Sequence, residues 1–255
     1  MVETFYSLDL PCSLALLGDL HGKPYQKVTD SLRRRRPDLI AIAGDVINGS
    51  PPEEDRSPLV SETNVLPFLE ECNSIAPTFL SLGNHEWLLD EEDLSRIRSA
   101  GVTVLDNHWI EWKGMVIGGL TSAYATGYRQ YREKLQGNTL RYPPMGFHEM
   151  GDGGKRLPEL QWLSAYCAVP GYHILLSHHP EYYPLIPKEI QLILSAHAHG
   201  GQWRIPAGVW APGQGWRPKW TKGVYDRRLV VTTGLANMTR VPRIFNPTEV
   251  VYLRP

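Results

Sequence analysis

The chain has 255 residues, of which 42% are apolar and 21% are charged, a composition typical of globular proteins and not of disordered ones. Its formal net charge of -1 provides no overall field for a nucleic-acid polymer or an anionic membrane, so binding to either is not expected. No apolar stretch approaches the ~20 residues that span a bilayer, so we expect no stable membrane anchor.

The cysteines of the chain are few and far apart. Cys12, Cys72 and Cys167 are odd in number and show no CxxC spacing, which predicts reduced thiols rather than disulfides. The residues after Met1 lack the basic and apolar regions of a signal peptide. We therefore expect a soluble, cytoplasmic protein.

The first third of the chain alternates short apolar runs with helical segments. The pattern predicts strands over residues 12–18, 38–44 and 77–83, and helices near residues 23–36 and 62–75. Runs of this kind, separated by helices, are typical of a parallel sheet buried on both faces. The arginines at 33–36 lie at the end of the first predicted helix, just before Pro37. Cations are favourable at a helix C-terminus because they offset its negative partial charge, so we interpret these arginines as a solvated helix end.

The following elements extend the same α/β pattern. A helix is predicted near 90–100, and a strand over 101–105. The runs "HWIEW" and "GMVIGGL" flank Lys113-Gly114 and predict an antiparallel hairpin. A helix near 158–168 and strands over 172–177 and 190–195 come next, and the tail at 224–253 predicts strands with a turn at Asn246-Pro247 between them.

One long segment interrupts the periodicity. Residues 121–157 are rich in Tyr, Arg, Gly and Pro, and an irregular loop of this length is either functional or mobile. We hypothesise that this insert lies over the functional site and selects the substrate. Because the chain shows no repeat, low-complexity tract or linker, we expect a single domain over residues 1–255.

Polar side chains collect where the predicted strands end. In an open α/β sheet the carboxyl ends of the strands carry the ligand site. The set holds four imidazoles, two carboxylates and one carboxamide, from Asp19, His21, Asp45, Asn84, His178, His197 and His199. This mixture of nitrogen and oxygen ligands without a thiolate suits Mn²⁺, Fe or Zn²⁺, and seven ligands are enough for two ions. The sequence therefore predicts a two-metal site, with ions ~3.5–4 Å apart if a carboxylate bridges them.

Five motifs in this order resemble those of the calcineurin-like metallophosphoesterases. They read "GDLHG", "GDVING", "GNHE", "LLSHHP" and "SAHAHGG". The later stretches "GGQWRIP" and "RIFNPTEVVYL" resemble the branch whose last motif reads GHTHGGQ, some members of which cleave UDP-diacylglucosamine or other phosphodiesters. The resemblance implies an α/β four-layer sandwich, in which two mixed β-sheets are flanked by helices. It also implies a dinuclear centre in which a metal-bridging hydroxide attacks phosphorus.

The resemblance also implies a role for each candidate residue. Asp19, His21 and His199 are expected to hold one metal. Asn84, His178 and His197 are expected to hold the other, and Asp45 to bridge the two. His85 is expected to protonate the leaving oxygen or to stabilise charge there. The expected ions are Mn²⁺ or Fe, with Zn²⁺ and Mg²⁺ as alternatives.

Three positions near these motifs need separate interpretation. Many relatives carry a second aspartate where this chain has Asn48, whose neutral amide is expected to orient His85 without favouring its imidazolium form. His85 is then a weaker acid catalyst, suited to good leaving groups. Glu86 is a possible substitute partner, although a solvated loop carboxylate is our preferred interpretation. Of the two histidines in "SHHP", His178 is taken as the ligand, and His179 as a residue behind the ligands or at the surface.

Several aromatic and histidine residues fit no motif. Trp203, Trp210, Trp216 and Trp220 alternate with cations and are interpreted as loop packing, with gripping of a nucleobase or an apolar phosphoester as the alternative. The remaining histidines, at positions 108, 148 and 173, are interpreted as structural.

The sequence favours a metal-dependent phosphoesterase that acts on a small-molecule phosphodiester or phosphomonoester. Two alternatives remain open. One is a catalytically silent scaffold that keeps the fold for protein binding, and the other is a lipid-nucleotide pyrophosphohydrolase. Catalytically silent scaffolds lose ligand residues. Every ligand position is filled in this chain, so the enzyme is favoured.

Overall fold

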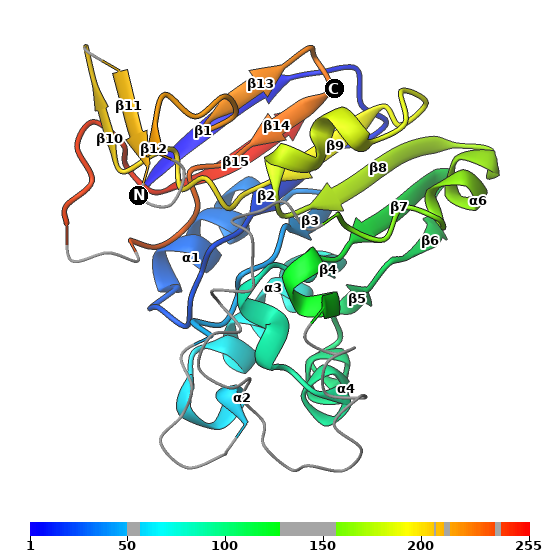
Figure 1. The fold of residues 1–255 in the computed structure, drawn as a ribbon. Coiled ribbons are helices and arrows are strands. Elements are labelled where there is room, and N and C mark those ends of the chain that lie inside the picture. The colour runs from blue at the N-terminus through cyan, green and yellow to red at the C-terminus, as the bar shows by residue number, and fades with distance from the viewer. Residues whose placement is uncertain (50–56, 128–156, 207, 212–214, 238–240) are drawn as a thin grey trace.

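Two six-stranded β-sheets lie at the centre of the structure, a computed structural model that describes residues 1–49, 57–127, 157–206, 208–211, 215–237 and 241–255 (Figure 1). The first sheet has the order β1 (Val2–Ser7), β15 (Glu249–Arg254), β2 (Leu14–Leu17), β3 (Leu39–Ile42), β4 (Thr78–Ser81), β5 (Thr103–Leu105). The second has the order β13 (Gly223–Tyr225), β14 (Leu229–Val231), β9 (Leu192–Ser195), β8 (Tyr172–Ser177), β7 (Met115–Leu120), β6 (His108–Trp112).

Both sheets are mixed. Strands β2, β3, β4 and β5 pair in parallel, and so do β7, β8, β9 and β14. Antiparallel pairs occur toward the edges, between β15 and β2, between β6 and β7, and between β13 and β14. The parallel strands of each sheet therefore end at one edge, which is where the candidate ligands follow them.

Alternation of side chains along the strands builds three apolar layers. In the first sheet Leu16 and Ala41 face the second sheet, whereas Leu17 and Ile42 face the helices. This is the period of two that a strand imposes. The helices on that outer side are α1 (Gln26–Arg35), α2 (Pro58–Ser61), α3 (Val65–Ile75) and α4 (Glu91–Ser99). Helix α6 (Leu163–Ala168) and the 3₁₀ segment η2 (Pro180–Leu185) cover the outer face of the second sheet.

The structure is therefore the predicted four-layer sandwich of two mixed sheets flanked by helices. In Figure 1, α2, α3 and α4 gather at the bottom of the view, whereas α6 lies at the upper right, beyond β6 to β8. The predicted strands and helices exist, and their ends differ by a few residues. The helix expected near 158–168 differs most, because it begins only at Leu163.

Two parts of the sheet architecture were not predicted. Strand β1 pairs in parallel with β15, at the other end of the chain, so local periodicity cannot reveal this contact. Trp203, Trp210 and Trp216 lie in a third, antiparallel sheet rather than in a packed loop, with strands β10 (Trp203–Ile205), β11 (Gly208–Ala211) and β12 (Gly215–Trp216). Trp220 lies outside this sheet and packs against the apolar layer on the outer face of the second sheet, as the loop interpretation predicts. Trp210 lies opposite both Trp203 and Trp216, so cross-strand aromatic pairs hold this sheet together.

Other predictions concern the insert and the membrane. Residues 128–156 of the insert, and with them His148, lie outside the described residues, so the hypothesis that it selects substrate stays a prediction. Among the described residues, none of the helices is long and apolar enough to cross a bilayer.

His173 is buried and its Nε2 lies 3.0 Å from the carbonyl oxygen of Tyr166, whereas His108 is exposed on β6.

The arginines at the end of α1 are more than a solvated helix end. Arg34 and Arg35 donate to the carboxylate of Glu3 on β1, and Arg33 donates to Glu71 on α3. The Ser31 hydroxyl donates a further hydrogen bond of 2.7 Å to Glu3. This bond, helped by the arginines and opposed by burial, lowers the pKa of Glu3 to about 2.

We expect Glu3→Gln to lower the free energy of unfolding by about 2 kcal/mol at neutral pH, after allowance for solvent screening. Because the pKa of Glu3 falls from 4.5 to about 2 on folding, its contribution is present above pH 4.5 and is lost as the pH falls toward 2. Urea denaturation at pH 7 and pH 3 measures the difference. Glu111→Gln, an exposed change on β6, is the control, and an equal loss at both pH values would contradict the assignment.

Candidate functional site

Loops from both sheets meet at one edge of the molecule. Asp19 and His21 follow β2, Asp45 follows β3, His178 follows β8, and His197 and His199 follow β9. The ligand atoms of Asp19, His21 and His199 lie within 4.8 Å of one another, and so do those of Asp45, His178 and His197. The structure thus brings six of the seven candidate ligands together in two groups of three carboxylate and imidazole side chains, with Asp45 in the second group and Asn84 in neither. The ligand atoms of His21, Asp45 and His85 also lie within 4.8 Å of one another.

The carboxylate of Asp45 lies between the two groups. Its Oδ2 is 3.0 Å from Nε2 of His178 and 3.9 Å from Nε2 of His21. The carboxylate of Asp19 also faces both sides, because its Oδ1 lies 3.9 Å from His21 and 4.0 Å from His178. The two groups are therefore adjacent and form one cluster of carboxylates and imidazoles, which we call the pocket.

Several buried polar atoms in this pocket have no hydrogen-bond partner among the described residues. They are Asp19 Oδ2, both ring nitrogens of His21, and Nε2 of His178. Oδ1 of Asn84, which directly precedes the 3₁₀ segment η1 (His85–Leu88), is likewise buried without a hydrogen-bond partner among the described residues. An unpaired buried polar group costs about 1–3 kcal/mol, so such a cluster calls for a ligand. Oxygen and imidazole nitrogen lone pairs are what divalent transition-metal ions bind. The unpaired oxygen and nitrogen atoms of these side chains are therefore suitable ligands for divalent cations.

The backbone of these loops is strained. Asp19, His21, Asp45, His197 and His199 all have φ between 49° and 62°, in the left-handed region. The neighbouring glycine Gly83 permits the close approach of two loops, since a Cβ there would lie 2.2 Å from Oδ1 of Asp45. Strain of this kind concentrates at functional sites, where it orients side chains in directions that regular secondary structure does not allow.

Charge and burial control the protonation of the pocket. Burial opposes ionisation of Asp45, but the charges of His178, His85 and His21 outweigh it and hold the pKa of Asp45 well below its usual range. Burial lowers the pKa of His197 to about 3 and that of His21 below its usual value. These two imidazoles are therefore neutral at physiological pH, which is the form that binds metal.

Hydrogen bonds to main-chain groups orient the histidines on the second sheet's side. The Nδ1 of His178 lies 2.6 Å from the carbonyl oxygen of Ala43, so Nδ1–H donates there and Nε2 is left facing Asp45. Nη2 of Arg243 lies 3.1 Å from Nδ1 of His199, and Asn246 donates to the His199 carbonyl oxygen. The sequence patterns do not single out Arg243 or Asn246 for this role, although both lie in the stretch "RIFNPTEVVYL".

Glu86 is buried, and the interpretation as a solvated loop carboxylate is wrong. Its oxygens accept hydrogen bonds from the backbone N–H groups of Gly83 at 2.7 Å and of Asp45 and Val46 at 2.8 Å each. The side chain turns inward because η1 begins at His85 and directs the next residue into the protein. Burial and the charge of Asp45 raise the pKa of Glu86 to about 7, while these N–H groups act in the opposite direction. Glu86 therefore joins the loops after β3 and β4.

We expect Glu86→Gln to lower the affinity for Mn²⁺ by ~10–100-fold, as is typical for groups that orient ligands. The amide of glutamine brings N–H groups against backbone N–H groups, which displaces the loop that carries Asp45. Isothermal titration calorimetry with Mn²⁺ measures the loss. The control is Glu92→Gln in the first turn of α4, and an unchanged affinity in Glu86→Gln would contradict this role.

His85 lies at the mouth of the pocket. Its side chain is 31% exposed, and Nε2 lies 3.9 Å from Oδ2 of Asp45. Its backbone N–H donates to Oδ1 of Asp45 at 2.9 Å. Its Nδ1 contacts the main-chain carbonyl oxygen of Asn48. The contact that orients His85 is thus made by the main-chain carbonyl of Asn48. Any residue at that position would supply this carbonyl.

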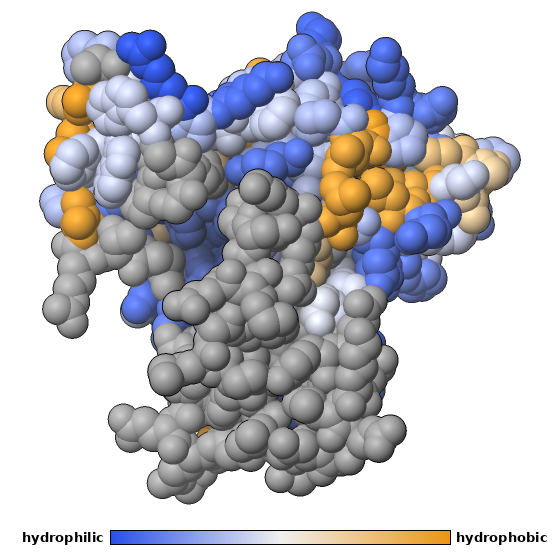
Figure 2. Space-filling view, in the orientation of Figure 1, coloured by the Kyte–Doolittle hydropathy of each residue, from blue (hydrophilic) through white to orange (hydrophobic). Residues whose placement is uncertain are grey.

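A separate cavity lies between α6 and η2. It has a volume of about 520 Å³ and is lined by Leu160, Leu163, Ser164, Cys167, Ala168, Leu185, Pro187 and Glu189. Hydrophobic side chains reach the surface on this side, at the right of Figure 2. The candidate ligands do not line this cavity, so it is distinct from the pocket.

Comparison with known proteins adds to this geometry. Residues 13–201 match the family described as calcineurin-like phosphoesterase. An uncharacterized metallophosphoesterase of Campylobacter jejuni is 26% identical over 243 residues, which cover 92% of this chain and 55% of the relative. Phosphodiesterase YaeI of Escherichia coli is 28% identical over 212 residues, which cover 77% of this chain and 63% of YaeI. The chain spans about half the length of the curated relatives it matches.

Among solved structures, that of TT1561 of Thermus thermophilus is similar to part of this chain. It is 12% identical and has a TM-score of 0.41, and the match covers 72% of this chain and 81% of that one.

Proposed function

Since the chain belongs to the calcineurin-like phosphoesterase family, we propose that two divalent cations bind in its pocket and support hydrolysis of a small-molecule phosphoester. The observation that carries the proposal is the pair of adjacent side-chain groups, each with two imidazoles and one carboxylate. A phosphodiester is the favoured substrate, because the relative YaeI is described as a phosphodiesterase. Mn²⁺ and Fe are the favoured ions.

Each candidate residue has a proposed role in this pocket. Asp19, His21 and His199 hold one cation, and Asn84, His178 and His197 hold the other. Asp45 would be shared by both cations, since its carboxylate faces His21 on one side and His178 on the other. Bound cations supply Lewis acidity and lower the pKa of water, so that a nucleophile is available at neutral pH.

His85 is the proposed proton donor to the leaving oxygen. With Nδ1–H donated to the carbonyl oxygen of Asn48, the proton on Nε2 is available on the partly exposed side of the ring. The Asn48 carbonyl carries no charge, so it orients the ring without strongly stabilising the imidazolium. His85 is therefore suited to substrates with good leaving groups.

The cytoplasm is the proposed location. The cysteines at positions 12, 72 and 167 are all free in the structure. Unpaired thiols are typical of proteins from a reducing compartment.

Reloading metal-depleted protein tests the proposed function. Samples with Mn²⁺, Fe²⁺, Zn²⁺ or Mg²⁺ are assayed on matched aryl phosphate mono- and diesters and on a UDP-linked pyrophosphate. We expect no turnover without metal, the highest turnover with Mn²⁺ or Fe²⁺, and a preference for the diester. A preference for the UDP-linked compound would favour the pyrophosphohydrolase instead, and no turnover with any ion would favour a silent scaffold.

A further inference from the structure

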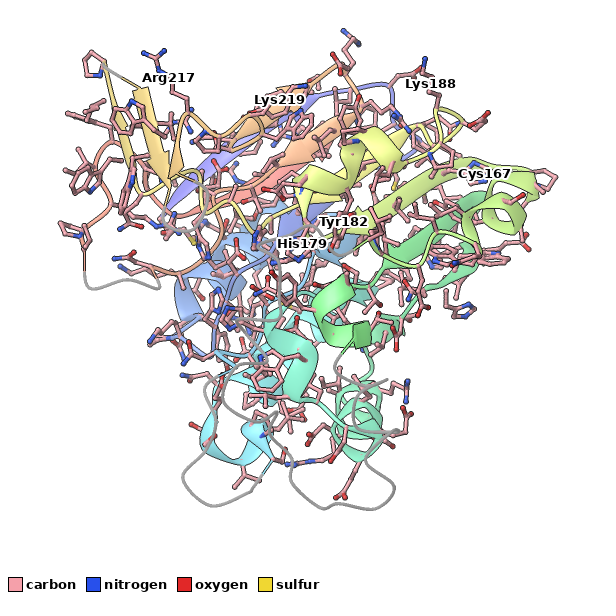
Figure 3. All side chains as sticks on the ribbon, viewed as in Figure 1. Cys167, His179, Tyr182, Lys188, Arg217 and Lys219 are labelled. Atoms are coloured by element: carbon pink, nitrogen blue, oxygen red, sulfur yellow. The ribbon has the colours of Figure 1, made fainter. Side chains whose placement is uncertain are left out.

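A further set of side chains that could hold a metal ion lies next to the pocket. His179 follows β8, Glu181 lies in η2, and His197 follows β9, and their ligand atoms are all within 4.8 Å of one another. Figure 3 shows His179 and Tyr182 side by side at the inner end of η2, and their ring centroids are 4.9 Å apart. Neither His179 nor Glu181 has a role in the proposed hydrolysis.

His179 is held in a defined orientation. It is buried, with 4% of its surface exposed, and its ring centroid lies 4.1 Å from that of His197. Its Nε2 lies 2.9 Å from Oγ of Ser122, just after β7. Ser122 Oγ also accepts a hydrogen bond from the backbone N–H of Tyr124, which fixes the hydroxyl. When Nε2–H donates to Ser122, the lone pair of His179 is on Nδ1, which is then the ring nitrogen left for a cation.

This arrangement resembles the way proteins prepare a histidine ligand. A metal-binding imidazole usually donates its second ring N–H to a fixed acceptor, which selects its tautomer. Two imidazoles with one glutamate form a ligand set that suits Zn²⁺. Glu181 is exposed, so an ion can reach this set from solvent.

We propose that His179, Glu181 and His197 form a zinc site that competes with the neighbouring group of Asp45, His178 and His197. His197 belongs to both groups. A neutral imidazole has one lone pair for a metal, so His197 serves one site at a time. Zinc bound by His179 and Glu181 therefore withdraws a ligand from the pocket, and excess Zn²⁺ inhibits the proposed hydrolysis.

Zinc binding is tested first, because it does not depend on the proposed function. Calorimetric titration with Zn²⁺ is performed on Asp45→Asn protein, in which the competing group lacks its carboxylate. Adding Glu181→Gln is expected to weaken one zinc-binding event by at least ~10-fold. Adding the control Glu189→Gln, an exposed glutamate shortly after η2, is expected to change nothing. The wild-type background provides the same comparison if Asp45→Asn protein does not fold.

Inhibition is the second readout. With the Mn²⁺-loaded enzyme and an aryl phosphodiester, Glu181→Gln is expected to raise the inhibitory Zn²⁺ concentration by at least ~10-fold. Its activity with Mn²⁺ alone is expected to equal that of the wild type. If zinc inhibits by replacing Mn²⁺ in the pocket, Glu181→Gln and wild type are inhibited alike. Equal zinc binding with and without Glu181→Gln overturns the site, whether or not the protein hydrolyses phosphoesters.

Discussion

Replacing Asp45 with asparagine is expected to reduce turnover of an aryl phosphodiester by at least ~10³-fold with every metal ion. Asp45 is the carboxylate that lies between the two ligand groups, 3.0 Å from His178 and 3.9 Å from His21. Asparagine keeps the shape of the side chain and removes the charge that two cations share. We therefore expect reduced metal content as well as reduced turnover, measured by atomic emission and by steady-state kinetics.

A matched aspartate separates this effect from a general effect of charge. Asp38 accepts hydrogen bonds from the backbone and hydroxyl of Ser13, away from the pocket. Asp38→Asn is expected to retain metal and turnover, even if its thermal stability falls. Retention of two bound ions in folded Asp45→Asn protein would show that Asp45 does not bridge them.

Replacing His85 with alanine is expected to lower kcat for an alkyl phosphoester by ~10²–10⁴-fold, the usual contribution of a general acid, and to leave the metal content unchanged. Alanine keeps the backbone N–H that donates to Oδ1 of Asp45, so the pocket retains its geometry. What is lost is the partly exposed ring that we propose as the proton donor.

A series of leaving groups distinguishes proton donation from simple charge stabilisation. The loss in His85→Ala is expected to be large for alkyl esters, which need a proton, and small for aryl esters with acidic leaving groups. Kinetics with both ester types, at fixed metal content, measure the contrast. An equal loss for all leaving groups would exclude His85 as the acid, and a loss of bound metal would assign it to the ligands.

Much of this site follows from local sequence patterns. An apolar run that ends in glycine and polar residues places those residues at the carboxyl end of a buried strand. Parallel pairing of β2, β3 and β4, and of β8 and β9, then brings the strand ends of each sheet to one edge of that sheet. The order of strands and motifs along the chain is therefore enough to predict that Asp19 and Asp45 converge, whereas their approach to His178 depends on how the two sheets pack.

The contacts that orient these residues could not be predicted in the same way. Glu86 accepts from the backbone of Asp45, 41 residues earlier, and Arg243 contacts His199, 44 residues earlier. Such contacts depend on how two loops approach, which periodicity does not encode. The pairing of β1 with β15 escapes prediction for the same reason, because its partner lies at the far end of the chain.

The left-handed backbone of Asp19, His21, Asp45, His197 and His199 has an evolutionary consequence. Each such residue costs about 1 kcal/mol relative to glycine, which adopts this conformation freely. A descendant that no longer used cations would gain stability by drifting to glycine or asparagine at these positions. This chain has aspartate or histidine at all five positions, so the loops carry a stability cost that the proposed metal binding would explain.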